Sequence, residues 1–368
     1  MDELELKQNE EQQNEVVDTE VPLDKSLKLM SPTMMVVRHF FRSKLSIIGL
    51  CMVVFLFLFS FVGPLVLSDR GYTNEYGQLV YESGNGKWGE IEKDDAGKDT
   101  YATSEATYTV NGKTYTIQQT TVTRLQYNVK TGPNADHWLG TDSAGYDIFV
   151  RLMYGGQISL IVSFLAVFLM TIFGIIMGGI AGYFGGGVDN VIMRLCDILT
   201  CLPGVPILLI VGTILDSSDI DGKYRIYLLM TFLTFISWPG TARLVRGQIL
   251  SLREQEFMVA AEAMGYSTSR RIFKHLVPNV MPQLIVSMSL GLGSMILYEA
   301  TLSYLNLGVK APYAAWGGMI NIITSDPDIL KNHWYIWVPA GVCIVIAVLG
   351  FNFVGDGLRD ALDPKARR

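Results

Sequence analysis

The chain has 368 residues, of which 49 % are hydrophobic and only 17 % are charged, and its mean hydropathy is +0.30. This composition argues against a soluble protein, because several apolar runs reach the roughly 20 residues that a helix needs to cross a bilayer. The net charge of −6 and the lack of a basic stripe interleaved with aromatic residues argue against a nucleic-acid partner. The four cysteines and four histidines are dispersed, so we predict neither a metal site nor a disulfide framework.

The N-terminal stretch, residues 1–24, is acidic and nearly free of large apolar residues, with nine acids against one lysine. This composition predicts a disordered tail, and the tail lacks the basic region and apolar core of a secretory signal. Residues 25–68 then form an N-terminal segment and the first membrane span, about Leu45–Leu67. Three basic residues directly before that run predict a cytoplasmic N-terminus.

Residues 69–136 differ in kind, since they are polar and rich in Tyr, Thr and Gly. Tyr108–Ile117 alternates around Asn111-Gly112, a pair that is typical of a two-residue hairpin turn because both residues tolerate positive φ. We therefore predict a small antiparallel β insert outside the membrane. Either partner recognition or bracing of the outer face would explain it.

Residues 137–355 contain five more predicted spans, preceded by a loop and a short surface helix over His137–Gly156. Glycines in the second span predict close helix–helix approach. Pro203 and Pro206 should kink the third span, and Pro239 the fourth. Residues 356–368 form a cytoplasmic tail. The five predicted spans are about Gln157–Phe184, Val191–Leu215, Ile226–Val245, Val280–Leu305 and Tyr335–Val354.

The charge distribution orients these spans with both termini inside. Segments assigned to the inside carry seventeen Lys and Arg, and those outside carry twelve, of which eight belong to the long segment between the first two spans. Long segments are discounted by the positive-inside rule, so the comparison favours this topology. The predicted fold class is an all-α polytopic membrane protein with six transmembrane helices and a β insert between the first two.

A charged island, Arg253–Pro282, separates the fourth and fifth spans. Glu254–Met264 has helical spacing, with one stripe made by Phe257, Ala261 and Met264, and Gly265 is placed to end this helix. Ser267 or Ser269 can cap a second short helix, which Pro278 should stop. Such a helix pair suits docking into a groove on a partner, and a structural loop lying on the membrane is an equal alternative on spacing alone.

Little in the sequence carries chemistry of its own. No G-x-x-x-x-G-K-[ST] pattern and no nucleophile–His–acid set is visible, so we predict neither a nucleotide site nor a catalytic residue. Glu299 in the fifth span is the exception to spans that are almost free of ionisable groups. It is a candidate for the transport pathway, and a hydrogen-bonded structural acid is an equal alternative.

The charged island resembles the EAA loop of ABC-importer permeases, whose pattern is E-A-A, three residues, Gly, nine residues, then I-x-L-P. Ala260-Ala261, Gly265 and Leu276-Val277-Pro278 stand at the matching distances. Val259 replaces the acid that begins the motif, and Glu262 lies three positions too late to be that acid.

The resemblance extends along most of the chain. The following segments are similar to signatures of the oligopeptide/dipeptide permease family, specifically its C-type subunit: RSKLSIIGL (Arg42–Leu50), LGTDSAGYDIFVRLMYGGQISL (Leu139–Leu160), YEATLSYLNLGVKAPYAAWGGMI (Tyr298–Ile320) and GDGLRDALDP (Gly355–Pro364). The β insert departs from shorter members of that family.

This resemblance implies a type I ABC importer permease in the bacterial plasma membrane. Its implied partners are a homologous second permease, two ATPase subunits that hold ATP and Mg, and an extracytoplasmic peptide-binding protein. The chain itself would bind no cofactor. The implied ATPase-coupling loop is residues 253–278, with Phe257, Ala260, Ala261, Glu262, Gly265, Tyr266, Arg270, Arg271 and Pro278 as its candidate contacts.

Other functions compete with peptide import. The same machinery could carry nickel or another small solute, although His and Cys are not clustered. Intramembrane charge and an internal repeat would favour a stand-alone channel or secondary carrier, and neither is seen. A membrane-anchored sensor would use the β insert for its ligand, but a sensor needs few spans.

Overall fold

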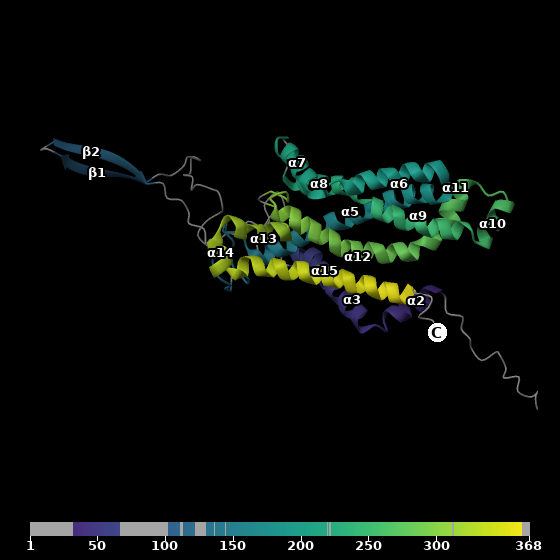
Figure 1. Cartoon of the computed structure of the whole chain (residues 1–368). Coiled ribbons are helices and arrows are strands. Elements are labelled where there is room, and N and C mark those ends of the chain that lie inside the picture. Colours follow the sequence, from purple (N-terminus) through teal and green to yellow (C-terminus); the bar gives the residue numbers. More distant parts are fainter. Residues whose placement is uncertain are drawn as a thin grey trace, which may run out of the picture.

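The computed structural model describes residues 32–66, 102–110, 113–121, 130–135, 137–143, 145–218, 220, 222–310 and 313–362. Most of these residues form an elongated bundle of helices, and two strands form a separate hairpin (Figure 1). The elements up to the second strand are α2 Pro32–Phe40, α3 Lys44–Phe57, a π-helix η1 Leu58–Val62, α4 Gly63–Val66, β1 Ala102–Val110 and β2 Lys113–Thr121. The later ones are α5 Ile148–Phe184, α6 Gly186–Cys201, α7 Gly204–Asp216, α8 Gly222–Ser237, α9 Pro239–Arg253, α10 Glu256–Ala263, α11 Thr268–Arg270, a π-helix η3 Arg271–Leu276, α12 Val277–Tyr304, α13 Trp316–Ser325, α14 Pro327–Asn332 and α15 Trp334–Leu362.

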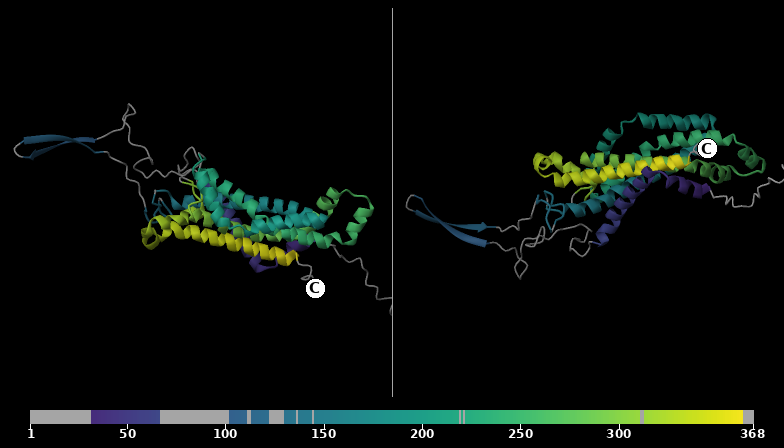
Figure 2. Two further views of the ribbon diagram at one scale, coloured as in Figure 1. Left: turned by 45° about the horizontal axis from the view of Figure 1, so that its top comes forward. Right: turned by 90° about the horizontal axis from the view of Figure 1, so that it is seen from below.

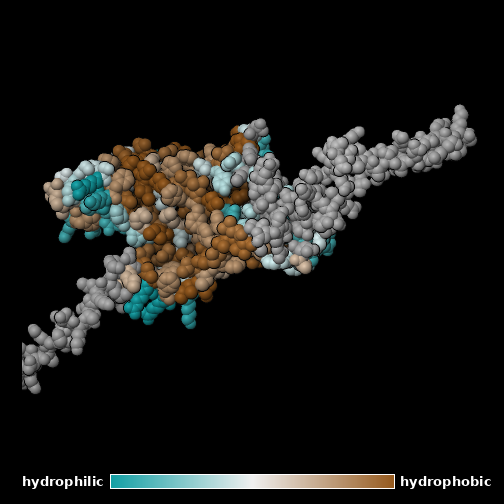
Figure 3. Space-filling model, turned by 180° about the vertical axis from the view of Figure 1, so that it is seen from behind, coloured by the Kyte–Doolittle hydropathy of each residue, from teal (hydrophilic) through white to brown (hydrophobic). Residues whose placement is uncertain are grey.

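Four helical stretches of the described residues are long and apolar enough to cross a membrane: Lys44–Val66, Ile148–Phe184, Thr268–Tyr304 and Trp334–Leu362. Two further pairs of helices pass the same test together, so the number of spans is four, or six if each pair is one broken span. Each of the six predicted spans overlaps one of these segments, although the helical stretch of the second begins at Ile148 and that of the fifth at Thr268. Apolar side chains cover most of the bundle surface, while hydrophilic residues gather toward its ends (Figure 3).

Both predicted proline kinks mark the broken pairs. α6 and α7 meet at 77°, where Pro203 is the residue that precedes α7, and α8 and α9 meet at 40°, where Pro239 is the first residue of α9. A proline cannot donate a backbone hydrogen bond to the preceding turn, so it is tolerated where one helix ends and the next begins. Pro206 lies in the first turn of α7 and adds no separate break.

The predicted glycine-mediated helix contact joins α5 to α9. Gly174, Gly178 and Gly182 recur every fourth residue on one face of α5 and are buried there. A Cβ built on Gly178 would lie only 2.9 Å from the Cβ of Val245, and one on Gly182 would lie 3.0 Å from the carbonyl oxygen of Arg246. The two backbones therefore approach more closely than any larger side chain would permit.

The structure corrects the prediction of a surface helix over His137–Gly156. Residues from Ile148 onward already belong to α5, which continues for 37 residues. Asp147 caps this helix by accepting a hydrogen bond from the backbone N–H of Val150 at 3.1 Å. Most residues up to Gly156 are buried because η1 and α13 pack here, and a Cβ on Gly156 would lie 2.7 Å from the Trp316 ring and 3.1 Å from the Cβ of Ser60.

The predicted hairpin is confirmed. β1 and β2 pair in antiparallel fashion, and Val110 opposite Lys113 leaves a two-residue connection at Asn111-Gly112. The part of the predicted insert that follows the hairpin, residues 122–129, lies outside the described residues. The same holds for the whole insert before Ala102.

The charged island and the segment that connects the last two long helices lie at opposite ends of the bundle. α10 and α11 are at one end, near the C-terminal end of α15, and α13 and α14 are at the other (Figures 1 and 2). The long helices α5, α12 and α15 run between the two ends (Figure 1).

Replacing Gly178 by alanine should destabilise the bundle by about 1–3 kcal/mol, because the new methyl group must separate α5 from α9. Gly240→Ala is the matched control, since Gly240 lies in α9 with nothing within 4 Å of a built Cβ. Thermal unfolding of the two purified variants in detergent compares them directly. Equal unfolding midpoints would contradict the close packing described here.

Candidate functional site

The charged island folds as a short helix, a tight bend and the start of a long helix. α9 ends at Arg253, α10 occupies Glu256–Ala263, and α11 begins at Thr268. Gly265 adopts a φ of +71°. Its N–H donates to the carbonyl of Glu262 at 2.9 Å, and the N–H of Tyr266 donates to the carbonyl of Ala261 at 3.2 Å. These two bonds form a Schellman motif, so the predicted glycine cap is confirmed.

The serine cap after the bend is Ser267 rather than Ser269. Its hydroxyl accepts from the backbone N–H of Arg270 at 3.4 Å. Pro278, however, does not stop the second helix. It lies in the first turn of α12, and the helical path from Thr268 continues to Tyr304. The π-helix η3 directly precedes this proline, and the first turn of a helix is where the missing N–H costs least.

The predicted apolar stripe on α10 is also corrected. Ala261 is buried together with Met258, but Phe257 and Met264 are 40 % and 62 % exposed. Met258 packs with Ile272 of η3 and with apolar residues of α9 and α12. The helix thus attaches to the bundle through one narrow face and presents apolar side chains on its outer faces.

The nine predicted coupling residues lie together at this end of the bundle. Six are exposed, two are partly buried and one is buried. The exposed ones are Phe257, Ala260, Glu262, Gly265, Arg270 and Pro278, the partly buried ones Tyr266 and Arg271, and the buried one Ala261.

Stacked rings and cations hold the bend. The guanidinium carbon of Arg270 lies 4.2 Å from the centre of the Tyr266 ring, within cation–π range. The ring of His275 stacks on the same tyrosine with centres 5.6 Å apart and planes 16° apart. Tyr266 therefore joins the residues just after the bend to η3.

Glu299 lies far from the coupling loop, in the last part of α12, and is fully buried in this chain. Its Oε1 accepts a hydrogen bond from the Ser303 hydroxyl at 2.7 Å. This contact agrees with a structural acid as well as with a pathway residue, and its pathway role stays a prediction. Within the described residues, no group of three or more His, Cys, Asp or Glu side chains is placed to hold a metal ion.

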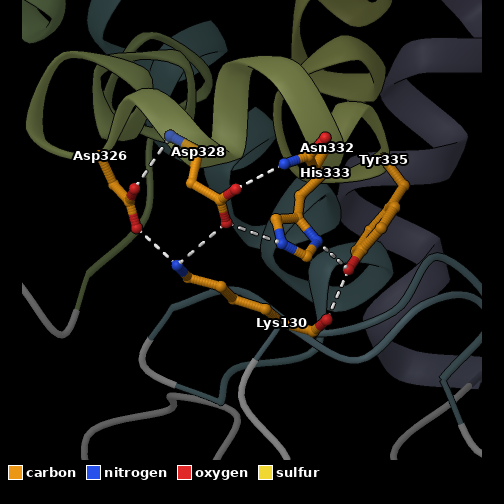
Figure 4. Close-up of polar contacts among 6 residues, drawn as sticks. All are labelled: Lys130, Asp326, Asp328, Asn332, His333 and Tyr335. Carbon is orange, nitrogen blue, oxygen red and sulfur yellow. Dashed lines mark hydrogen bonds and ion pairs between the residues drawn. The ribbon is translucent and has the colours of Figure 1, made fainter.

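A polar cluster at the opposite end was not predicted from the sequence (Figure 4). Lys130, where the described chain resumes after the hairpin, extends its Nζ to Asp326 Oδ2 at 2.5 Å and to Asp328 Oδ2 at 3.8 Å. His333 approaches Asp328 Oδ2 at 3.2 Å through Nε2 and the Tyr335 hydroxyl at 2.8 Å through Nδ1. We call these five residues the Lys130 anchor.

The anchor also fixes the backbone of Lys130. The Tyr335 hydroxyl donates to its carbonyl at 2.5 Å, and its own N–H donates to the carbonyl of Asp142 at 2.9 Å. Lys130 has a φ of +53°, which is uncommon for a residue with a side chain. Contacts to three separate segments compensate for this local strain. They attach the chain that follows the insert to α14 and α15.

The electrostatics of the anchor favour its ionised form. The hydrogen bond from Lys130 lowers the pKa of the Asp326 carboxyl, and the hydrogen bond from Asn332 lowers the pKa of Asp328. The hydrogen bond with Asp326 in turn raises the pKa of Lys130. Only Asp326-Pro327, typical of a helix start, was visible as a local sequence signal, because Lys130 pairs with it across 196 residues.

Comparison with known families decides the identity of the chain. The family of binding-protein-dependent transport system inner membrane components matches residues 170–368, more than half of the sequence. The chain belongs to this family. A second family, the N-terminal transmembrane domain of oligopeptide transport permease C, matches residues 31–78 of this chain.

Individual relatives of this transport component agree with that assignment. The oligopeptide transport system permease protein OppC of Bacillus subtilis is 42 % identical over 243 residues, which is 66 % of this chain and 76 % of the relative. The dipeptide transport system permease protein DppC of Bacillus subtilis is 40 % identical over 64 % of this chain and 71 % of the relative. The glutathione transport system permease protein GsiD of Pectobacterium atrosepticum is 37 % identical over 64 % and 75 %, respectively.

Among solved structures, the transport component is similar to a chain of the inward-facing MetNI methionine ABC transporter. The TM-score is 0.45, the sequence identity is 18 %, and the match covers 58 % of this chain and 97 % of that chain.

The Lys130 anchor should weaken in acid. Because the pKa values of Asp326 and Asp328 are lowered in the folded protein, their contribution is present above the ordinary carboxyl pKa of about 4 and is lost as the pH falls through the lowered values. Spin labels on Gly132→Cys and Leu330→Cys, with the exposed Cys51 and Cys201 replaced by serine, report the separation of the two segments.

We expect a narrow distance distribution at neutral pH that broadens in acid. Lys130→Met should broaden it at every pH, whereas Lys331→Met, which removes an exposed lysine of α14 outside the anchor, should leave the response unchanged. A distribution that stays narrow in the Lys130 variant would show that the anchor does not hold these segments together.

Proposed function

We propose that the chain is the transmembrane permease subunit of an ATP-driven importer that translocates peptides delivered by an extracytoplasmic binding protein. Membership of the family and the relatives named for oligopeptides and dipeptides support the substrate class. The observation that carries the coupling role is α10, a short helix at one end of the bundle with an exposed apolar surface and a fixed glycine bend.

The surface of α10 suits a partner groove. Phe257, Val259 and Met264 are exposed although each is apolar, and Val259 is the most exposed at 63 %. Charged residues surround them, so burial of this surface in a membrane is a poor fit, and docking in a protein groove satisfies both kinds of residue. Membership of this transport family implies that the partner is an ATPase subunit.

Transport then requires two states of the permease. Movement of a docked ATPase pair would displace α10, and the bundle would switch between outward and inward access of a pathway shared with a second permease. Met258 supports this route, because it packs against residues of α9, η3 and α12, which extend into the bundle. The long helices then carry the displacement toward α13 and α14.

The division of chemistry follows from the same proposal. ATP and Mg belong to the partner ATPase subunits, and this chain contributes the membrane pathway and the coupling loop, residues 253–278. We place it in the bacterial plasma membrane with both termini in the cytoplasm. In this orientation, α10 and α11 lie inside, and the Lys130 anchor with the β insert lies outside, where a binding protein arrives.

Reconstitution tests this function. The chain, its operon-encoded second permease and its ATPase subunits are placed in proteoliposomes with the binding protein, and uptake of labelled peptide, glutathione and nickel is compared with and without ATP. We expect ATP-dependent uptake of peptide. Uptake by this chain alone would favour a stand-alone carrier, and uptake of nickel without peptide would overturn the substrate assignment.

Gly265→Val should abolish most ATP-driven uptake while the chain still inserts and assembles. Valine at a φ of +71° costs about 1–3 kcal/mol of local strain and would distort the bend that presents α10. Gly186→Val is the matched control, because Gly186 also has a positive φ, +53°, and open space around its Cβ but lies outside the loop. Equal uptake by the two variants would remove the bend from the coupling mechanism.

A further inference from the structure

Two arginines of the coupling loop contact one residue of α5. Arg253, at the end of α9, donates from Nη1 to the carbonyl of Tyr183 at 2.9 Å. Arg271, at the start of η3, places its guanidinium carbon 5.6 Å from the centre of the Tyr183 ring. Tyr183 is the second-last residue of α5, the longest helix of the described chain. The loop therefore begins and returns at the same point of the bundle.

Arg271 makes a second contact that reaches α10. Its Nη1 lies 2.9 Å from Oε1 of Glu262, so one guanidinium joins α10 to the inner end of α5. The two partners differ in burial, since the side chain of Arg271 is 16 % exposed and that of Glu262 is 72 % exposed. An arginine that is largely enclosed and contacts both a carboxylate and an aromatic ring is held in place more firmly than a surface lysine would be.

The apolar attachment of α10 leads in the same direction. Met258 packs in a cluster with Ile272 and Leu276, and Tyr183 packs against that cluster from α5. α10 thus reaches η3 and α12 through Met258 and reaches α5 through the Glu262–Arg271–Tyr183 series. A force on the exposed side of α10 therefore acts on both the Met258 packing and the Glu262–Arg271–Tyr183 contacts.

We propose that Arg271 is a positioning residue that transmits displacement of α10 to α5, because its guanidinium pairs with Glu262 and also lies against the ring of Tyr183. This inference rests on the proposed coupling role of the loop and names the contact through which that role is exerted. Arg271 touches neither substrate nor nucleotide in this arrangement. Its loss should leave assembly intact and impair the link between hydrolysis and transport.

The test compares variants of the complete importer in proteoliposomes and reports ATP hydrolysed per peptide imported. Arg271→Gln should raise this ratio roughly 2- to 30-fold, the range expected when a residue between coupled sites is altered. Tyr183→Phe should behave as the wild type, because it retains the ring, whereas Tyr183→Leu should resemble Arg271→Gln. Arg194→Gln is the control for loss of one positive charge, because Arg194 lies on α6 with a side chain that is 85 % exposed.

A charge exchange makes the test specific. Glu262→Arg and Arg271→Glu should each uncouple transport when made alone, and the double variant should restore a ratio close to that of the wild type. The proposal is overturned if Arg271→Gln keeps the wild-type ratio, or if it releases the ATPase subunits on purification, since Arg271 would then act in docking.

Hydrogen exchange separates this inference from the function on which it rests. In the purified complex without ATP, the amides of residues 256–264 should exchange faster in Arg271→Gln than in the wild type. If the wild-type complex imports no peptide, the proposed function fails, and faster exchange would still support the contact series. Unchanged exchange would overturn it whatever the transport result.

Discussion

The close contact between α5 and α9 is the constraint on which the α10 end of the molecule depends. Gly174, Gly178 and Gly182 allow the two helices to approach closely, because α5 places no side chain between them at these positions. α9 then ends beside the end of α5, so Arg253 reaches the carbonyl of Tyr183 and the loop departs from a fixed point. Without that contact, neither the position of α10 nor its orientation would be determined, because α10 buries only a narrow face of its own.

Different interactions stabilise the two ends of the bundle: apolar packing at one end and charge pairs at the other. At the α10 end, apolar packing through Met258 is supplemented by arginine contacts, and much apolar surface is left open for another protein. At the α14 end, the Lys130 anchor is a partly exposed network of charges whose separate contributions are small because water reaches them. Its value is geometric, because it fixes one backbone position at the point where the chain returns from the insert.

Much of the fold was predictable because its signals are local. Apolar run lengths marked the spans, Pro203 and Pro239 marked the breaks, and Asn111-Gly112 marked the hairpin. Gly265 was predicted as a helix cap from its position alone, and the Schellman bonds bear this out. Where a backbone conformation depends on one residue and its neighbours, the sequence is sufficient.

The errors arose where distant segments decide the outcome. α5 begins at Ile148, where Asp147 caps it, but its first turns are buried because η1 and α13 pack on them, and residues 137–156 alone do not show that packing. The buried face of α10 contains Met258 rather than Phe257 because η3 and α12 select it. Lys130 and Asp326 are separated by 196 residues, so their pairing leaves no local trace.

The central claim is that the open face of α10 is covered by an ATPase subunit in the working importer. A photo-crosslinking amino acid at Val259, the 63 % exposed residue of α10, tests it in membranes that contain the assembled complex. Ile210 in α7 is 62 % exposed and is the matched position elsewhere on the bundle. We predict an ATPase adduct from position 259 and none from position 210. Adducts of lipid alone at position 259, or an ATPase adduct from both positions, would contradict the account.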